Sequence, residues 1–196
     1  MLRHELAERG IEIVDLSTAE FDSAAETDTP QGILLVAEIP ERALNHFSAS
    51  NPSRFLVLDG VQDPGNVGTL IRTAAALGVT ATVALPGTVD LWNAKVVRSA
   101  MGAHFLHPAL HCTWDELRLF LDESQIPLWG SAADGTIVDG ASPPARLALA
   151  VGNEGAGLSP HVRDGAERVV SLPLASGVES LNVAVAAGIL LYELRP

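Results

Sequence analysis

The chain has 196 residues, of which 47% are hydrophobic, and a formal net charge of −12. This length and composition suffice for one substantial buried core, while the negative charge argues against a general nucleic-acid binder, since phosphate contacts require clustered Lys and Arg. The single cysteine, Cys112, excludes a disulfide framework and a multi-cysteine zinc site, and no segment reads as a membrane span or signal peptide, so we expect a cytoplasmic protein.

The first 50 residues differ in character from the rest. They hold ten acidic and three basic residues, a net charge of −7, which leaves −5 for residues 51–196. Apolar runs predict strands at Gly10–Ser17 and Gln31–Pro40, separated by a polar loop without a clear period at residues 18–31. The composition of residues 49–53 predicts a linker.

From residue 55 onward, short apolar runs alternate with segments of helical period. The runs predict buried strands at Phe55–Gly60, Val79–Leu85, Pro127–Ala132, Leu147–Gly152 and Arg168–Leu174. Such an alternation of strands and helices predicts an α/β fold, with a parallel sheet flanked by helices.

The predicted helices have recognisable starts. Asn66 is expected to cap a helix that stops at Gly78, and Asn93 one that stops at Gly102, while Thr113 begins a capping box. The last helix, residues 180–195, is apolar nearly all round, so we expect it to be buried in the core or against a second copy.

Three glycine-containing loops follow predicted strands, at residues 63–74, 151–160 and 171–186. They read DPGNVGTLIRTA, VGNEGAGLSP and SLPLASGVESLNVAVA. Ligands of open α/β sheets sit beyond the carboxyl ends of the strands, where such loops gather. The chain has neither the dinucleotide fingerprint G-x-G-x-x-G nor a Walker loop, HExxH or G-x-S-x-G. These absences argue against ATP hydrolysis, zinc proteolysis and standard hydrolase chemistry.

Read together and in this order, the three loops resemble the three motifs of the SpoU-like (TrmH) family of RNA ribose 2′-O-methyltransferases, in the SPOUT superfamily. The match extends from Phe55 to the C-terminus, and Lys95–Pro108 also resembles the family's stretch between the first two motifs. The resemblance implies an α/β fold with a C-terminal trefoil knot that holds S-adenosylmethionine, a homodimer that suits the apolar last helix, and ribosomal or transfer RNA as substrate.

The resemblance assigns the cofactor side of the site to the second and third loops. Gly152 lets the backbone approach a ligand closely, and Leu172 and Leu181 offer apolar surface to an adenine. Without the resemblance, these residues would be read as a strand-end glycine and two core leucines. The predicted cofactor-binding set is Val151, Gly152, Asn153, Leu172, Leu181 and Asn182.

The predicted catalytic set is Asn66, Arg72, Glu154, Ser180 and Asn182, which match the family's motif positions. Arg72 stands where the family has its catalytic arginine, proposed to take the proton from the ribose hydroxyl. A guanidinium stays protonated at neutral pH, so we expect Arg72 to bind an RNA phosphate and place the hydroxyl, and leave open which group removes the proton. Glu154 is expected to accept a hydrogen bond from ribose or to orient Arg72.

Each of these residues also has a simpler interpretation. Helix capping alone explains Asn66 and Ser180, a surface salt bridge explains Arg72, and a solvated turn explains Glu154. Lys95 and Arg98 lie three apart on a predicted helix and are expected to contact RNA phosphates with Arg72, although a solvated face explains them equally well.

Two further expectations concern metals and domains. The three histidines between residues 104 and 111 are too loosely spaced for metal ligands, and no metal is expected. Residues 10–38 resemble only the closing portion of the L30e-like RNA-binding domain that many family members carry. We therefore expect residues 1–50 to be a remnant of that domain with a linker, and residues 51–196 to be the catalytic domain.

The leading hypothesis is S-adenosylmethionine-dependent methylation of a ribose 2′-hydroxyl in rRNA or tRNA. A second hypothesis is a non-catalytic dimeric RNA-binding or assembly protein with the knotted fold, and the intact motif residues argue against it. A third is a Rossmann-type oxidoreductase, and the missing dinucleotide fingerprint argues against that.

Overall fold

The computed structural model describes residues 2–25, 30–47, 52–138 and 143–195, and it divides into two units, residues 1–39 and 40–196. In the first unit, helices α1 (Leu2–Glu8) and α2 (Thr18–Ala24) form without burying a described side chain. Ser17 and Glu20 form a capping box at the start of α2. The polar loop predicted at residues 18–31 is therefore wrong over α2, and the S-x-x-E spacing was the signal that could have revealed it.

The two strands predicted in the first 50 residues are also wrong. The described residues 10–17 and 31–40 belong to no strand, and their apolar side chains are largely exposed, with Val36 at 95%. A strand is stable when a neighbouring strand pairs its N–H and C=O groups, and these segments find no such neighbour among the described residues. Of the predicted linker at 49–53, residues 49–51 lie outside the described ranges.

In its described part, the second unit contains a six-stranded sheet in the order β3-β2-β1-β5-β4-β6. Every pairing in it is parallel. The strands are β1 (Ser53–Asp59), β2 (Ala81–Ala84), β3 (Ala109–His111), β4 (Leu128–Ile137), β5 (Arg146–Gly152) and β6 (Arg168–Ser171). This confirms the predicted α/β fold with a parallel sheet. Five strands were expected, whereas β3 was missed because three residues are too few to show a period.

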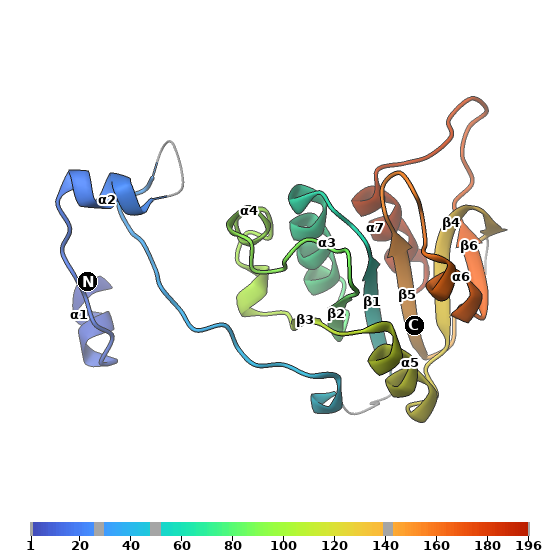
Figure 1. Ribbon diagram of the computed structural model, residues 1–196, viewed down its shortest axis with the longest axis horizontal. Helices are drawn as coiled ribbons and strands as arrows, with labels where there is room; N and C mark the ends of the chain where they lie inside the picture. The colour runs from blue at the N-terminus through green and yellow to red at the C-terminus, as the bar shows by residue number, and fades with distance from the viewer. Residues whose placement is uncertain (1, 26–29, 48–51, 139–142, 196) are drawn as a thin grey trace. The chain divides into compact units, whose positions relative to one another are not determined.

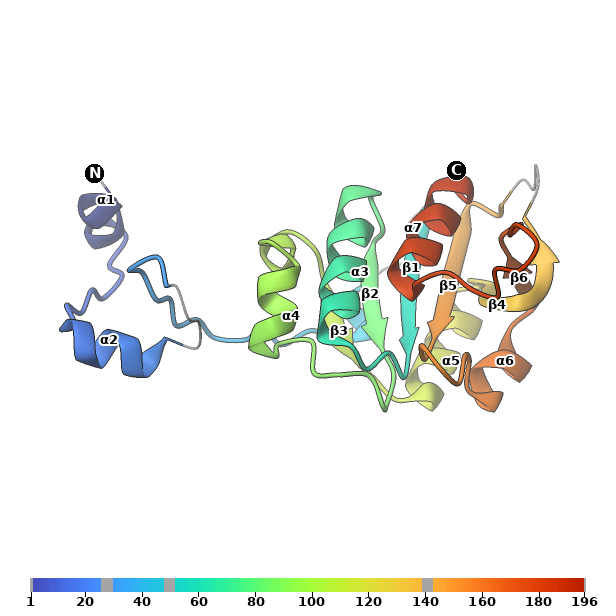
Figure 2. The ribbon, with the colours of Figure 1, turned by 90° about the horizontal axis from the view of Figure 1, so that it is seen from above.

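Helices cover both faces of this sheet (Figures 1 and 2). One face carries α3 (Pro64–Ala76), with α4 (Ala94–Ser99) and α7 (Val183–Glu193) packed on either side of it. The other face carries α5 (Trp114–Glu123) and α6 (Pro160–Gly165). Two 3-10 turns complete the described elements, η1 (Leu44–His46) and η2 (Ala103–Phe105).

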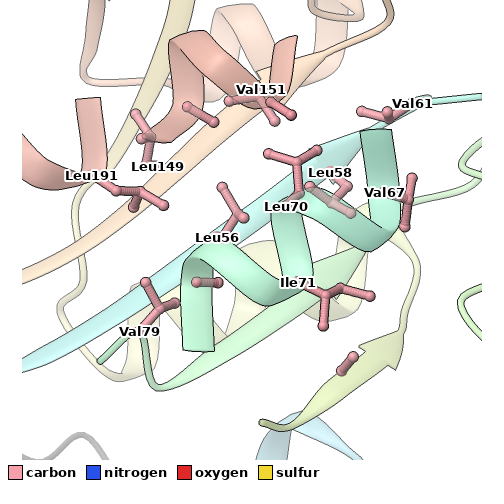
Figure 3. Packing of buried hydrophobic residues seen from close by; sticks show 14 of the residues in the cluster. Leu56, Leu58, Val61, Val67, Leu70, Ile71, Val79, Leu149, Val151 and Leu191 are labelled. Atoms are coloured by element: carbon pink, nitrogen blue, oxygen red, sulfur yellow. The ribbon is translucent and has the colours of Figure 1, made fainter. Parts of the chain in front are cut away.

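Two hydrophobic cores lie on the two faces, because successive strand residues point to opposite sides. Leu56 and Leu58 of β1 pack against α3, where Leu70 and Ile71 lie over them (Figure 3). Phe55 belongs to the core on the α5 side. These buried strands supply most of the apolar area that stabilises the fold.

The observed N-caps differ from the prediction for one helix and agree with it for two others. Asp63 caps α3 in place of Asn66, because its side chain accepts a hydrogen bond from the Asn66 backbone N–H at 2.8 Å and Pro64 follows at the first helical position. Asn66 therefore lies inside the first turn, and its side chain is free for other partners. Asn93 and Thr113 cap α4 and α5 as predicted, although α4 ends at Ser99 and not at Gly102.

The last helix is buried on one side only. Ala184, Ala187, Leu190 and Leu191 face the core, whereas the apolar side chains of Val185, Ile189 and Tyr192 are 50%, 41% and 51% exposed. Burial of the whole helix within this chain, one of the two expectations, is therefore wrong. None of the described helices is long and apolar enough to cross a membrane.

A buried histidine makes the stability of the second unit depend on pH. His107 is 3% exposed, and its Nε2 lies 2.8 Å from Thr82 Oγ1. Burial, followed by the nearby positive charge of Arg42, lowers the pKa of His107 from 6.5 to about 4. Between these two values the unfolded chain binds a proton that the folded chain does not, so stability is present above pH 6.5 and is lost as the pH falls toward 4.

We expect urea unfolding to show this loss. Between about pH 7.5 and pH 5, the free energy of unfolding should fall by about 2 kcal/mol more in the wild type than in His107→Gln, which keeps a polar partner for Thr82 but does not titrate. Equal pH dependence in the two proteins would contradict the burial of a neutral imidazole.

Candidate functional site

At the carboxyl edge of the sheet, the chain leaves β1 and β5 toward different faces. These neighbouring strands continue in opposite directions, because β1 leads to α3 on one face and β5 leads to α6 on the other (Figure 1). Such a switch point leaves a crevice beyond the strand ends, where open α/β sheets bind ligands.

The loop after β5 is closed by its own hydrogen bonds. The backbone N–H groups of Asn153 and Gly157 each donate to the carbonyl of the other residue at 2.9 Å. The Asn153 side chain accepts from Gly155 N and Ala156 N, and it donates to the Gly60 carbonyl at the end of β1, each at 2.9 Å. The second motif is therefore a rigid turn attached to the strand that precedes the first motif.

Glu154, at the tip of this turn, binds the start of α3. Its carboxylate accepts hydrogen bonds from the backbone N–H groups of Gln62 at 3.2 Å and Asp63 at 3.1 Å, and from Asn66 Nδ2 at 3.0 Å. Burial by itself raises the pKa of Glu154, but these hydrogen bonds outweigh it and the pKa lies below its ordinary value. Glu154 is thus an anion at the N-terminal end of a helix.

Asn66 joins the first motif to the third. Its Oδ1 accepts a hydrogen bond from Asn182 Nδ2 at 2.8 Å, while its own Nδ2 donates to Glu154. Asn182 is the N-cap of α7, and its Oδ1 accepts from Ala184 N and Val185 N. Three predicted site residues therefore form one chain of hydrogen bonds that links the three motifs.

A cavity of about 610 Å³ lies between the second and third motifs. Its wall is formed by the middle of β4, the ends of β5 and β6, the loop after β5, and the segment that leads into α7 with the first turn of that helix. All six residues predicted for the cofactor side line it: Val151, Gly152, Asn153, Leu172, Leu181 and Asn182. Of the predicted catalytic set, Glu154, Ser180 and Asn182 line it, and Asn182 belongs to both sets. Ser180 is not a helix cap, because Asn182 takes that position.

Some of the lining was not predicted. Ser131, Ala132 and Ala133, which follow the buried part of β4, belong to the wall, as do Leu174 and Glu179. Their small or exposed side chains carry no pattern that distinguishes them in the sequence. Among the described residues of the lining, none is Lys or Arg, and two are glutamates. Such a wall does not suit the pyrophosphate of a dinucleotide.

The predicted basic residues lie outside the cavity. Arg72 is exposed on α3 and makes no hydrogen bond or ion pair with a described residue. Glu154 therefore holds Asn66, and the expectation that it orients Arg72 finds no contact in the structure. Lys95 and Arg98 are both exposed on α4, which packs against α3.

The three histidines near β3 each have a hydrogen-bond partner in the protein, and two of them bond to the backbone of Leu91. His104 Nε2 lies 2.8 Å from the Leu91 carbonyl, His107 contacts Thr82, and His111 Nε2 accepts from Leu91 N at 3.3 Å. Across the described residues, no group of three or more His, Cys, Asp or Glu side chains is placed to hold a metal ion.

Comparison with known proteins decides the family. The profile of the SpoU rRNA Methylase family matches residues 53–192. The chain belongs to the SpoU rRNA methylase family. A curated relative, the 23S rRNA (guanosine(2553)-2′-O)-methyltransferase RlmP of Bacillus subtilis (strain 168), is 40% identical over 194 residues, which cover 96% of this chain and 74% of the relative. The 23S rRNA (guanosine-2′-O-)-methyltransferase RlmB of Haemophilus ducreyi is 32% identical, covering 98% of this chain and 82% of that one.

Solved structures of SpoU methyltransferases have the same fold. The AdoMet-bound rRNA methyltransferase from Sinorhizobium meliloti superposes with a TM-score of 0.88 at 27% identity, covering 97% of this chain and 74% of that one. The SpoU methyltransferase AviRb from Streptomyces viridochromogenes, in complex with AdoMet, has a TM-score of 0.73 at 31% identity and covers 80% and 62% of the two chains. The parallel six-stranded sheet flanked by helices is thus the SpoU architecture.

Removing the charge of Glu154 tests the hydrogen bonds that join the motifs in this SpoU chain. We expect Glu154→Gln to lower the free energy of unfolding by about 1–2 kcal/mol, because an amide can place an N–H group against the donors that the carboxylate now accepts from. Urea unfolding would measure the loss. Glu123→Gln, an equivalent change at an exposed residue at the end of α5, should be neutral, and equal stability of the two variants would contradict the role of Glu154.

Proposed function

We propose that this SpoU-family chain is an enzyme that transfers a methyl group from S-adenosylmethionine to a ribose 2′-hydroxyl of RNA. The proposal rests on the hydrogen bonds that join the three motifs. Asn66, in the first turn of the helix that bears Arg72, bonds to Glu154 and Asn182, which line a cavity large enough for the methyl donor. The names of the two curated relatives support the same reaction and favour ribosomal RNA as the substrate.

The cavity fits S-adenosylmethionine in size and in chemistry. Its volume of about 610 Å³ is that of a small-molecule site. A Cβ atom added to Gly152 would lie 2.2 Å from the Gly157 carbonyl carbon, so glycine is required for the turn that forms one wall. Leu172 and Leu181 offer apolar surface for the adenine. The proposed cofactor set remains Val151, Gly152, Asn153, Leu172, Leu181 and Asn182.

The acceptor side is proposed to lie on α3. When bound, S-adenosylmethionine would supply a methyl group on a positively charged sulfur: the methyl would form a C–O bond with the ribose, the C–S bond would break with its electron pair passing to sulfur, and the hydroxyl proton would pass to a neighbouring base or to water. Arg72 binds the phosphate next to the reacting ribose and places its hydroxyl in line with that methyl group. Asn66, Glu154 and Asn182 hold α3 against the cavity through their hydrogen bonds, and Ser180 lines the cavity next to them.

The charge of the helical face supports RNA binding there. Residues 64–111 contain three basic residues, Arg72, Lys95 and Arg98, and one acidic residue, Asp90, which gives a net charge of +2 in a chain of −12. Three exposed basic side chains on α3 and α4 of an otherwise acidic protein favour contact of RNA phosphates with these two helices.

The remaining parts of the proposal concern the chain as a whole. The C-terminal segment forms the trefoil knot, which the return of α7 from β6 to the side of α3 supports. Two copies form a homodimer through α7, and the exposed Val185, Ile189 and Tyr192, spaced along one stripe of the helix, support this.

The compartment in which the protein acts is proposed to be the cytoplasm. Residues 1–50 derive from an L30e-like RNA-binding domain, and the family match at residues 53–192 supports a catalytic domain from residue 51.

Replacing Arg72 separates methyl transfer from cofactor binding. We expect Arg72→Ala to lower the rate of methyl transfer to rRNA fragments at least about 100-fold, because the acceptor is no longer placed. The dissociation constant for S-adenosylmethionine, measured by calorimetry, should change less than about twofold, since Arg72 does not line the cavity. Full activity of the variant would reject the role of Arg72, and a wild-type chain that binds no S-adenosylmethionine would reject the proposed function.

A charge on the exposed stripe of α7 tests the dimer. We expect Ile189→Glu to shift the wild-type dimer to a monomer in sedimentation velocity, because a carboxylate would be buried without a partner. Leu119→Glu, at an exposed leucine of α5 on the opposite face of the sheet, should leave the dimer intact. A wild-type protein that sediments as a monomer would contradict the proposed assembly.

A further inference from the structure

We propose that Glu179 makes the cavity bind S-adenosylmethionine in preference to S-adenosylhomocysteine, the product that remains after methyl transfer. This inference rests on the proposed function. The two molecules share the same nucleoside and amino-acid groups, and they differ in one methyl group and in the positive charge on sulfur. A residue that distinguishes them strongly must therefore interact with that charge.

The charges around the cavity single out Glu179. The described lining of the cavity contains two carboxylates, Glu154 and Glu179, and neither Lys nor Arg. Glu154 accepts three hydrogen bonds from Gln62, Asp63 and Asn66, which occupy both of its oxygens. Glu179, by contrast, makes no hydrogen bond or ion pair with any described residue. It is the carboxylate of the wall that is left to interact with a bound cation.

The position of Glu179 in the chain fits this role. It lies in the segment between β6 and α7, immediately before Ser180 and Leu181, which line the same cavity. Glu179 is exposed, and the apolar side chains of Leu172 and Leu174 line the same cavity. A ligand that fills the cavity displaces water from it, and a carboxylate attracts a cation more strongly there than in bulk water.

The negative charge of Glu179 affects the affinities of the two ligands differently. The carboxylate stabilises the sulfonium of the donor, whereas the thioether of the product is neutral and gains nothing from it. Attraction between single charges at several ångströms near a protein surface changes affinity on the order of threefold to tenfold at moderate salt. Spent product thus leaves the cavity more readily than fresh donor does.

The same charge has a kinetic consequence. Positive charge on sulfur disappears as the methyl group is transferred, so Glu179 stabilises the bound donor more than the transition state. Loss of the carboxylate should therefore raise KM for S-adenosylmethionine without lowering kcat. A residue that only held the segment in shape would instead lower kcat or the melting temperature when replaced.

Calorimetric titration of three ligands tests the inference on the full chain. S-adenosylmethionine, S-adenosylhomocysteine and sinefungin, which carries an ammonium group in place of the sulfonium, are titrated into wild type, Glu179→Gln and Glu167→Gln. Glu167 is an exposed residue outside the cavity wall, so its variant makes the same change in net charge at a distance.

For Glu179→Gln we expect weaker binding of S-adenosylmethionine and sinefungin by about threefold to tenfold and a change of less than about twofold for S-adenosylhomocysteine. For Glu167→Gln all three affinities should stay at the wild-type values. Raising the salt concentration should reduce the preference for S-adenosylmethionine in the wild type and leave it unchanged in Glu179→Gln.

Two results would overturn the inference. Equal weakening of S-adenosylmethionine and S-adenosylhomocysteine would place Glu179 at the amino group that both molecules carry, and unchanged affinities would place it away from the ligand. In either case the proposed function stands, because the wild type binds both molecules. A wild-type chain that binds neither molecule would reject the proposed function itself.

Discussion

The side-chain amide of Asn66 is the contact on which the site depends. It donates to Glu154 and accepts from Asn182, which are 88 and 116 residues away in the sequence. An amide group has both a donor and an acceptor, so one short side chain can bond to an acceptor in one loop and to a donor in another. Hydrophobic packing brings α3, α7 and the strands together, but it does not set the register of their ends. These directional hydrogen bonds do.

This contact is available because other residues cap the helices. Asp63 caps α3, so the Asn66 side chain is not used by its own helix. Asn182 caps α7 with its oxygen and reaches Asn66 with its nitrogen, so one residue both starts the helix and attaches it to the first motif. The three motifs are thus coupled through helix ends, where backbone N–H groups need partners in any case.

Charge is divided between the two sides of the proposed site. The cavity wall carries carboxylates, which suit a cationic donor, whereas the outer surfaces of α3 and α4 carry the exposed Arg72, Lys95 and Arg98, which suit a polyanion. The two regions meet at the start of α3, where the donors around Glu154 stabilise its negative charge. An acidic chain can therefore bind RNA on one face and hold a cation in a neighbouring cavity.

The sequence sufficed to predict the α/β class, five of the six described strands, and a set of six residues that the structure places around one cavity, because buried strands and motif residues leave a local pattern. It did not determine which residue caps α3, since Asp63 and Asn66 are both good caps and the proline between them decides. It wrongly predicted strands in the first 50 residues, where apolar runs have no neighbouring strand to pair with. The bond from Asn66 to Glu154 and Asn182, and the wall formed by Ser131 and Glu179, were decided by the tertiary structure. These contacts join residues far apart in the chain, and the order of the parallel strands is what brings them together.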